Sequence, residues 1–265
     1  MLKDITLGQY FPGDTFIHRL DPRTKIILVV VYIIALFNAV GWISYLVMIA
    51  VTGICMAISR ISLKNIFKGL KPMIFIIALT AILNIFYTQG TPIREGWIIT
   101  WEGIGRAIRM MLRITLLITG TFLLTYTTSP MELTDGLEIL LKPLNKIKVP
   151  VHELTLMMSM ALRFIPTLIE ETDKIMSAQR ARGADFETGN IIQRAKALLP
   201  ILVPLFVSSF RRADELAIAM ESRCYHGGEG RTRLKLLRFE NGDYAAFFFG
   251  AVFLAGIFVM KRYGL

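Results

Sequence analysis

Long runs of apolar residues constrain this chain more than any other feature. Four runs carry few charges, and one of them, Ile26–Ile58, is too long for a single crossing at about 1.5 Å per helical residue. Segments of about 17 to 20 such residues are long enough to span the hydrocarbon core of a bilayer. With 54% hydrophobic residues and a mean hydropathy of +0.55, the sequence is more apolar than a soluble domain. It therefore predicts a multi-spanning membrane protein.

We predict an all-α membrane protein with about five transmembrane helices and long amphipathic helices outside the membrane. The Ile26–Ile58 run is divided at "FNAVGW", where Asn, Gly and an interfacial Trp42 favour a tight hairpin between two spans. The three further spans are expected at Pro72–Tyr87, Ile108–Thr127 and Tyr244–Met260.

The positions of Lys and Arg predict the orientation of the chain. Basic residues gather before the first span and between the second and third, whereas the first hairpin is uncharged. These basic residues are Lys3, Arg19, Arg23, Lys25, Arg60, Lys64, Lys68 and Lys71. Because segments rich in Lys and Arg stay in the cytoplasm, we expect a multi-pass protein of the cell membrane with a cytoplasmic N-terminus. Lys261 and Arg262 then lie on the outer side, against the rule.

Three arginines open the fourth predicted span, at spacings that place Arg106, Arg109 and Arg113 on one helix face. An arginine within a span is a candidate functional residue. We favour the alternative that these side chains extend to the outer interface.

Residues 129–242 mix charges of both signs with apolar residues at helical spacing, and we expect no spanning segment among them. They are predicted to form a cytoplasmic domain between residues 1–128, which hold four spans, and residues 243–265, which hold the last. Ser129, Pro130 and Glu132 predict the start of a short helix that ends at Pro143. A long helix with Pro166 inside it then runs to Gly183. A third helix, bent by two prolines, runs from about Ile191 to Cys224 and is closed by two glycines; these residues are Pro200, Pro204, Gly227 and Gly228.

The ends of the two long helices repeat each other. In "DKIMSAQRARG" and "DELAIAMESRC", Arg182 matches Arg223 with a repeat of 41 residues. A single arginine at a helix end is usually a solvated complement to the helix dipole. Two copies, each beside a small residue, suggest a helix end that enters a groove on a partner, where the guanidinium binds a carboxylate or a carbonyl. We therefore expect two similar partner surfaces.

These stretches resemble the transmembrane T component of energy-coupling factor (ECF) transporters, which are relatives of ABC transporters that import vitamins and metals. The resemblance covers almost the whole chain: "HRLDPRTK" (residues 18–25) is similar to the segment before the family's first span, and the two helix ends are similar to its paired Ala-Arg-Gly signatures. The resemblance implies a non-catalytic membrane subunit whose long coupling helices dock into two ABC-type ATPases. It also implies a substrate-binding S component as a further partner.

The resemblance assigns ATPase docking to two sets of three residues, which are Ala181, Arg182, Gly183 and Ser222, Arg223, Cys224. The second set departs from the signature, because Ser and Cys replace Ala and Gly. The missing glycine weakens the expectation that both helices end by the same backbone turn. Two different ATPases would suit two unequal helix ends.

A Met-rich helix face precedes the first docking set. Methionine is flexible and suits surfaces that accept changing partners. The face is expected either to pack within the protein or to contact the S component, and its residues are Leu154, Met157, Met158 and Met160.

Several chemical functions lack their motifs. The sequence has no Gly-rich phosphate-binding loop of the ATPase type, so ATP chemistry must come from another chain. We expect no catalytic residues, no cofactor and no metal site, because His18, His152 and His226 are scattered and Cys55 and Cys224 are far apart.

Three alternatives remain open. The acidic residues Glu170, Glu171 and Asp173 would suit an intramembrane enzyme, although they lie on a face typical of solvated helices. The basic run Gly230–Arg238 would suit nucleic acid, but directly before a span it favours anionic lipid headgroups, and we expect no nucleic acid partner. A self-sufficient channel or secondary carrier is disfavoured, because the spans lack the charge pairs and broken helices of a midplane site.

Overall fold

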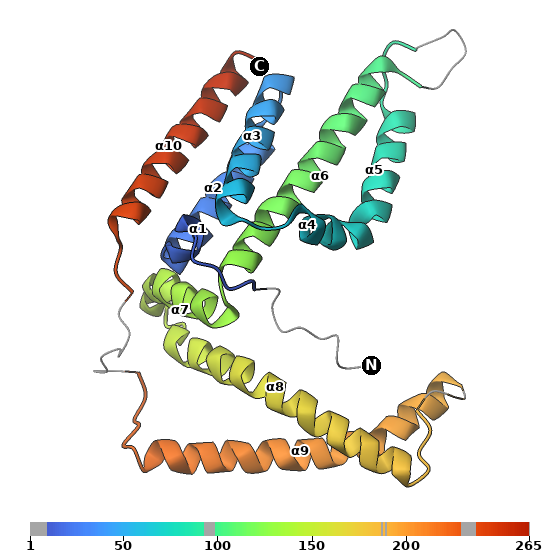
Figure 1. Ribbon diagram of the computed structural model, residues 1–265, viewed down its shortest axis with the longest axis vertical. Coiled ribbons are helices and arrows are strands. Elements are labelled where there is room, and N and C mark those ends of the chain that lie inside the picture. Colours follow the sequence, from blue (N-terminus) through green and yellow to red (C-terminus); the bar gives the residue numbers. More distant parts are fainter. Residues whose placement is uncertain (1–9, 93–98, 187, 189, 229–236, 265) are drawn as a thin grey trace. The chain divides into compact units, whose positions relative to one another are not determined.

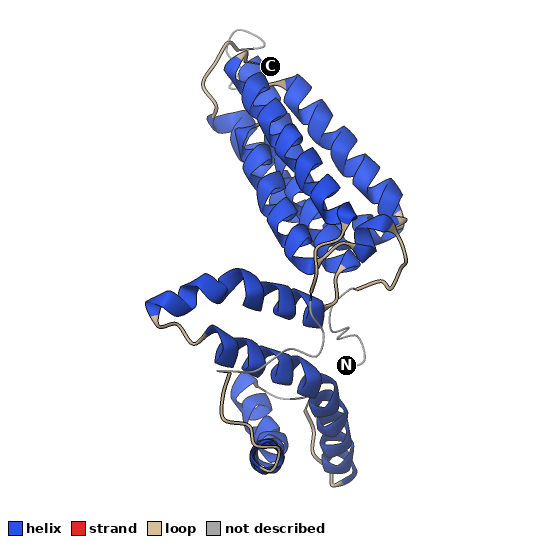
Figure 2. Cartoon of the chain, turned by 90° about the vertical axis from the view of Figure 1, so that its left-hand side faces the viewer, coloured by secondary structure: helices blue, strands red, loops and turns tan. Residues whose placement is uncertain are grey.

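The computed structural model describes residues 10–92, 99–186, 188, 190–228 and 237–264, and its elements are helices, apart from one isolated bridge between Pro92 and Thr100 (Figure 2). Lys3 and most of the basic run Gly230–Arg238 lie outside the described residues. The predicted all-α fold class is confirmed. The chain divides into two compact units, one with residues 8–136 and 236–265 and one with residues 137–235.

The first unit holds most of the predicted spans (Figure 1). Its helices are α1 Phe16–Arg19, α2 Pro22–Asn38, α3 Trp42–Ser59, α4 Leu63–Leu70, the 3₁₀ helix η2 Lys71–Met73, α5 Ile74–Tyr87, α6 Trp101–Thr127 and α10 Asn241–Arg262. The second unit holds the 3₁₀ helix η3 Lys142–Ile147, α8 Val151–Ala181 and α9 Ile191–Glu221, and α7 Pro130–Leu141 crosses from the first unit into the second.

Five helical segments of the described chain are long and apolar enough to cross a membrane. Four of them are α3, α4 with α5, α6 and α10, which agree with predicted spans. The first predicted span corresponds to α2, whose 17 residues are at the lower end of the spanning range of about 17 to 25. The predicted split of the Ile26–Ile58 run is confirmed, because α2 ends at Asn38 and α3 begins at Trp42.

The fifth such segment is α9, and it corrects the expectation that residues 129–242 contain nothing of spanning length. The physical reason lies in Pro200 and Pro204, which bend a helix without ending it when neighbouring backbone bonds are kept. Apolar residues on both sides of these prolines therefore belong to one helix of 31 residues.

The spans pack through small residues and a few buried hydroxyl groups. The core cluster consists of Ala35, Leu36, Ala39, Tyr45, Met48, Leu116 and Ile257. A Cβ atom at Gly120 of α6 would collide with the ring of Tyr32, so glycine lets α2 and α6 approach closely. The Tyr32 hydroxyl then donates to the Leu116 carbonyl at 3.2 Å and lies 2.8 Å from the Thr52 hydroxyl.

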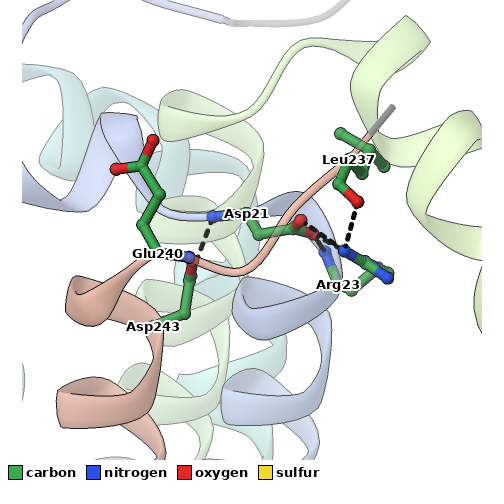
Figure 3. A network of polar contacts seen from close by, with 5 residues as sticks. All are labelled: Asp21, Arg23, Leu237, Glu240 and Asp243. Atoms are coloured by element: carbon green, nitrogen blue, oxygen red, sulfur yellow. Dashed lines mark hydrogen bonds and ion pairs between the residues drawn. The ribbon is translucent and has the colours of Figure 1, made fainter. Parts of the chain in front are cut away.

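A charged network ties the start of α2 to the start of α10 (Figure 3). The Asp243 carboxylate, which is 2% exposed, accepts from the Asp21 backbone N–H and from the Glu240 backbone N–H, both at 2.9 Å. Asp21 caps α2 and pairs with Arg23 at 2.8 Å. Arg23 also donates to the Leu237 carbonyl at 3.1 Å. Residues more than 200 positions apart in the sequence are thereby fixed together.

Lys25 binds the ends of two other helices. Its buried Nζ donates to the carbonyls of His18 and Thr127, both at 2.9 Å. These carbonyls belong to the last turns of α1 and α6, where a cation also complements the helix dipole. The segment "HRLDPRTK" therefore acts structurally, since its charged residues join four helices at one end of the unit.

The arginines of α6 contact the hairpin between α2 and α3. Arg113 donates to the Ala39 carbonyl at 3.0 Å, and the Arg109 guanidinium lies 5.5 Å from the Trp42 ring centroid. The fourth span begins earlier than predicted, at Trp101, so all three arginines lie inside the helix. For Arg113 these contacts replace the expected extension to the interface, because a hairpin carbonyl is closer than the membrane surface.

We predict that Asp243→Ala lowers the free energy of unfolding by about 2 to 3 kcal/mol, because two buried backbone N–H groups lose their acceptor. Asp243→Asn keeps one acceptor oxygen and should have a smaller effect. Thermal unfolding of the detergent-solubilised chain measures both. Equal melting temperatures for wild type and Asp243→Ala would contradict this role.

Candidate functional site

The first predicted docking set lies at the end of α8. The helix ends at Ala181, Arg182 follows, and Gly183 has a φ of +86°. The Gly183 N–H donates to the Arg180 carbonyl at 2.9 Å, and the Ala184 N–H donates to the Gln179 carbonyl at 3.0 Å. These two bonds close the helix by a turn whose central residue is left-handed.

The second docking set ends α9 by the same turn. The helix ends at Glu221, and Cys224 has a φ of +56°. The Cys224 N–H donates to the Glu221 carbonyl at 2.8 Å, and the Tyr225 N–H donates to the Met220 carbonyl at 3.0 Å. Each of these atoms is 41 residues after its equivalent at the end of α8.

The two turns match bond for bond, which corrects two expectations. The loss of glycine does not change the backbone, because Cys224 adopts the left-handed conformation that Gly183 adopts in α8. The third helix is closed at Cys224 and not at Gly227 and Gly228, since the turn is complete before the chain reaches them. The repeat read from the sequence is therefore a structural repeat.

All six side chains or backbones of the docking sets are exposed. Within the described part of the chain, neither Arg182 nor Arg223 makes a side-chain hydrogen bond or an ion pair. Two exposed cations with no partner in their own chain are available for an acidic or carbonyl-rich surface.

α8 and α9 pack against each other through an ion pair that the sequence analysis missed. Arg212 Nη2 lies 2.8 Å from Glu171 Oε2, and both side chains are partly buried. Arg212 follows Glu171 by 41 residues, so the two partners occupy equivalent positions of the repeat. A contact between equivalent positions is what a local two-fold axis produces. Opposite charges one repeat apart were the available signal.

This ion pair also bears on the acidic residues considered for an intramembrane enzyme. Glu171 is held by Arg212, whereas the neighbouring Glu170 is exposed on α8. The described residues contain no group of His, Cys, Asp and Glu arranged to hold a metal ion.

The Met-rich face lies in the N-terminal half of α8. Leu154, Met157 and Met158 are exposed by 47%, 57% and 48%, and Met160 is partly buried. Exposed apolar side chains of this size, set side by side on one helix, are typical of an interaction surface.

The start of α8 is anchored by its own contacts. His152 Nδ1 lies 3.0 Å from a carboxylate oxygen of Glu138 on α7. The backbone of Gly228 packs on the His152 ring so closely that a Cβ atom would collide with it. The segment that follows the second docking set is thereby held against the base of α8.

Comparisons with known proteins agree with this arrangement. The family model described as "CbiQ: Cobalt transport protein" matches residues 13–234. The chain is 57% identical over 250 residues to an energy-coupling factor transporter transmembrane protein EcfT of Clostridium kluyveri, covering 93% of each chain. It is 52% identical over 263 residues to the protein of the same name in Ruminiclostridium cellulolyticum, covering 98% of each. It is 45% identical over 245 residues to that of Lactococcus lactis subsp. cremoris, covering 91% of this chain and 92% of the relative.

Cys224→Gly should stabilise the end of α9, because glycine adopts a positive φ without the steric cost that an L side chain carries there. We expect a gain of about 1 kcal/mol, and a loss of similar size for Gly183→Ala at the equivalent position. Chemical denaturation in detergent measures both. Changes of the same sign at the two positions would contradict the equivalence of the turns.

A double-mutant cycle tests the ion pair. Glu171→Arg and Arg212→Glu should each destabilise the packing of α8 on α9, and the exchanged pair should recover about 0.5 to 1 kcal/mol, as expected for a partly exposed pair. Glu170→Arg is the matched control, since Glu170 lies one residue away and faces solvent. A recovery with Arg212→Glu as large as that of Glu171→Arg would place the pair elsewhere.

Proposed function

The chain belongs to the family of energy-coupling factor transporter transmembrane proteins, and we propose that it couples two cytoplasmic ABC-type ATPases to a substrate-binding S component. ATP hydrolysis is assigned to the ATPases, and this chain is a non-catalytic subunit. The cargo class is a vitamin or another micronutrient, which the S component selects.

The observation that carries this proposal is the repeated helix end. Two exposed arginines, Arg182 and Arg223, follow helix turns that match bond for bond. Identical turns orient the backbone, and hence the arginine, in the same way relative to each helix. Two copies of one docking element fit two partners of one architecture, which is what a pair of ABC-type ATPases offers.

The helix pair gives a means of transmitting motion. α8 and α9 contact each other at equivalent positions, and their C-terminal ends point in opposite directions (Figure 1). A partner bound at each end therefore moves its own helix about the shared contact between Glu171 and Arg212. The Met-rich face on α8 is assigned to the S component, because flexible methionines keep contact with a surface that changes its orientation.

The side chains of the two docking sets remain unequal although the backbones match. Ala181 and Gly183 are replaced by Ser222 and Cys224, so the second set is bulkier and offers a hydroxyl group and a thiol. This difference supports two non-identical ATPases, each matched to one helix end. We also assign the N-terminus to the cytoplasm, on the side of the basic residues Arg19, Arg60, Lys64 and Lys68.

Co-purification tests the docking assignment. Tagged wild type, Arg182→Glu, Arg223→Glu and the double variant are isolated from solubilised membranes, and bound ATP-binding proteins are quantified. A reversed charge at a desolvated contact costs about 3 to 5 kcal/mol, which is more than a hundredfold in affinity. We expect each single variant to lose one ATPase and the double variant to lose both.

Lys174→Glu is the matched control, because it reverses an exposed charge of α8 outside the docking set. Full retention of the ATPases by this control would show that the losses are local. Retention by the double variant would contradict docking at Arg182 and Arg223.

A further inference from the structure

A cavity of about 650 Å³ lies in the first unit, apart from the docking sets. The segment before α1 forms one wall with Phe11, Asp14 and Phe16, and the junction of α3 and α4 forms the other with Arg60, Ser62 and Asn65. Its volume is within the range of ligand-binding pockets, about 300 to 1,000 Å³. The cavity lies at the end of the spans that carries α1 and α4, where the basic residues gather (Figure 1).

Three polar side chains at this cavity have no partner among the residues that the structure describes. The Arg60 guanidinium forms no ion pair, the Ser62 hydroxyl does not cap α4 although Ser62 is the residue before it, and the Asn65 amide makes no side-chain bond. A guanidinium, a hydroxyl and an amide converging on one cavity are the donors that bind phosphate oxygens.

The backbone at Arg60 increases the interest of this side chain. Arg60 has a φ of +54° and ends α3 in the left-handed conformation, which glycine adopts at lower cost. The α3 helix end thus carries an arginine at a position where glycine would be more stable. The side chain therefore adds something that the helix end itself does not need.

The remaining charges at the cavity are few. His18 Nε2 donates to the Phe11 carbonyl, and the Thr15 hydroxyl donates to His18 Nδ1. Burial lowers the pKa of His18, so the ring is neutral at pH 7. Arg60 and Asp14 are then the two charges of the lining, and no ion pair joins them.

We propose that this cavity binds the phosphate group of a membrane phospholipid, with Arg60 and Ser62 as its ligands. A lipid is favoured over a soluble phosphate because Phe11 and Phe16 are 44% and 52% exposed at the same opening and offer apolar contact to acyl chains. The neighbouring α4 adds exposed Leu63 and Phe67 beside Lys64 and Lys68, a pattern typical of a helix lying in the headgroup layer.

Native mass spectrometry of the delipidated full-length chain tests this proposal, with phosphatidylglycerol added back in detergent micelles. Arg60→Gly removes the cation and suits the left-handed backbone, so its thermal stability should equal or exceed that of wild type. We expect it to bind phosphatidylglycerol about tenfold more weakly, the loss of one charge-assisted contact. Asp14→Asn should bind more tightly, because it removes a negative charge from the cavity.

Lys68→Gln is the matched control, since it removes one positive charge from α4 outside the cavity lining. An equal loss of lipid in Arg60→Gly and Lys68→Gln would show general attraction to the basic surface and overturn the proposal. Diacylglycerol, which has no phosphate, should not compete. Competition by soluble glycerophosphate as strong as that by phosphatidylglycerol would identify a soluble ligand and overturn the lipid assignment.

Discussion

Charged groups at the ends of the spans hold the first unit together. A bilayer offers no water to buried polar groups, so every such group must find its partner within the protein. The chain meets this constraint with the pairs Asp21–Arg23 and Asp21–Asp243 and with the two carbonyls bound by Lys25. Three spans, α2, α6 and α10, are fixed at one end by these contacts. Arg113 provides a similar contact at the hairpin between α2 and α3.

The second unit follows a different principle, because its distinctive groups are left exposed. A fixed helix pair with an internal ion pair between Glu171 and Arg212 presents two free arginines on matching turns. Rigid local geometry together with an unpaired charge suits docking, since the helix end is already in its bound conformation and little ordering is required. Anchored spans and an exposed helix pair are together what a coupling subunit needs.

Much of this arrangement was predictable from the sequence. Apolar runs gave the helices of the membrane, Asn38 to Trp42 gave the first hairpin, and Ser129 with Glu132 gave the start of α7, where each binds the other's backbone N–H at 3.2 Å. Such features depend on local spacing and on capping chemistry, which neighbouring residues determine.

The missed features depend on contacts between distant residues. Lys25 reads as a surface charge by composition, yet it is buried between the ends of α1 and α6. The left-handed conformation of Cys224 could not be read from a residue type that rarely adopts it. Pro200 and Pro204 were correctly expected to bend α9, but the apolar residues around them were not joined into one span-length helix.

The most direct test of the account is site-specific photo-crosslinking in intact membranes, with a photoreactive residue at Ala181 or at Ser222, each beside a docking arginine. The account predicts that both positions crosslink to ATP-binding proteins, and that the same residue at Lys174 does not. Crosslinks from Ala181 and Ser222 only to lipid or to other copies of this chain would contradict it. Docking through paired helix ends would then have to be abandoned.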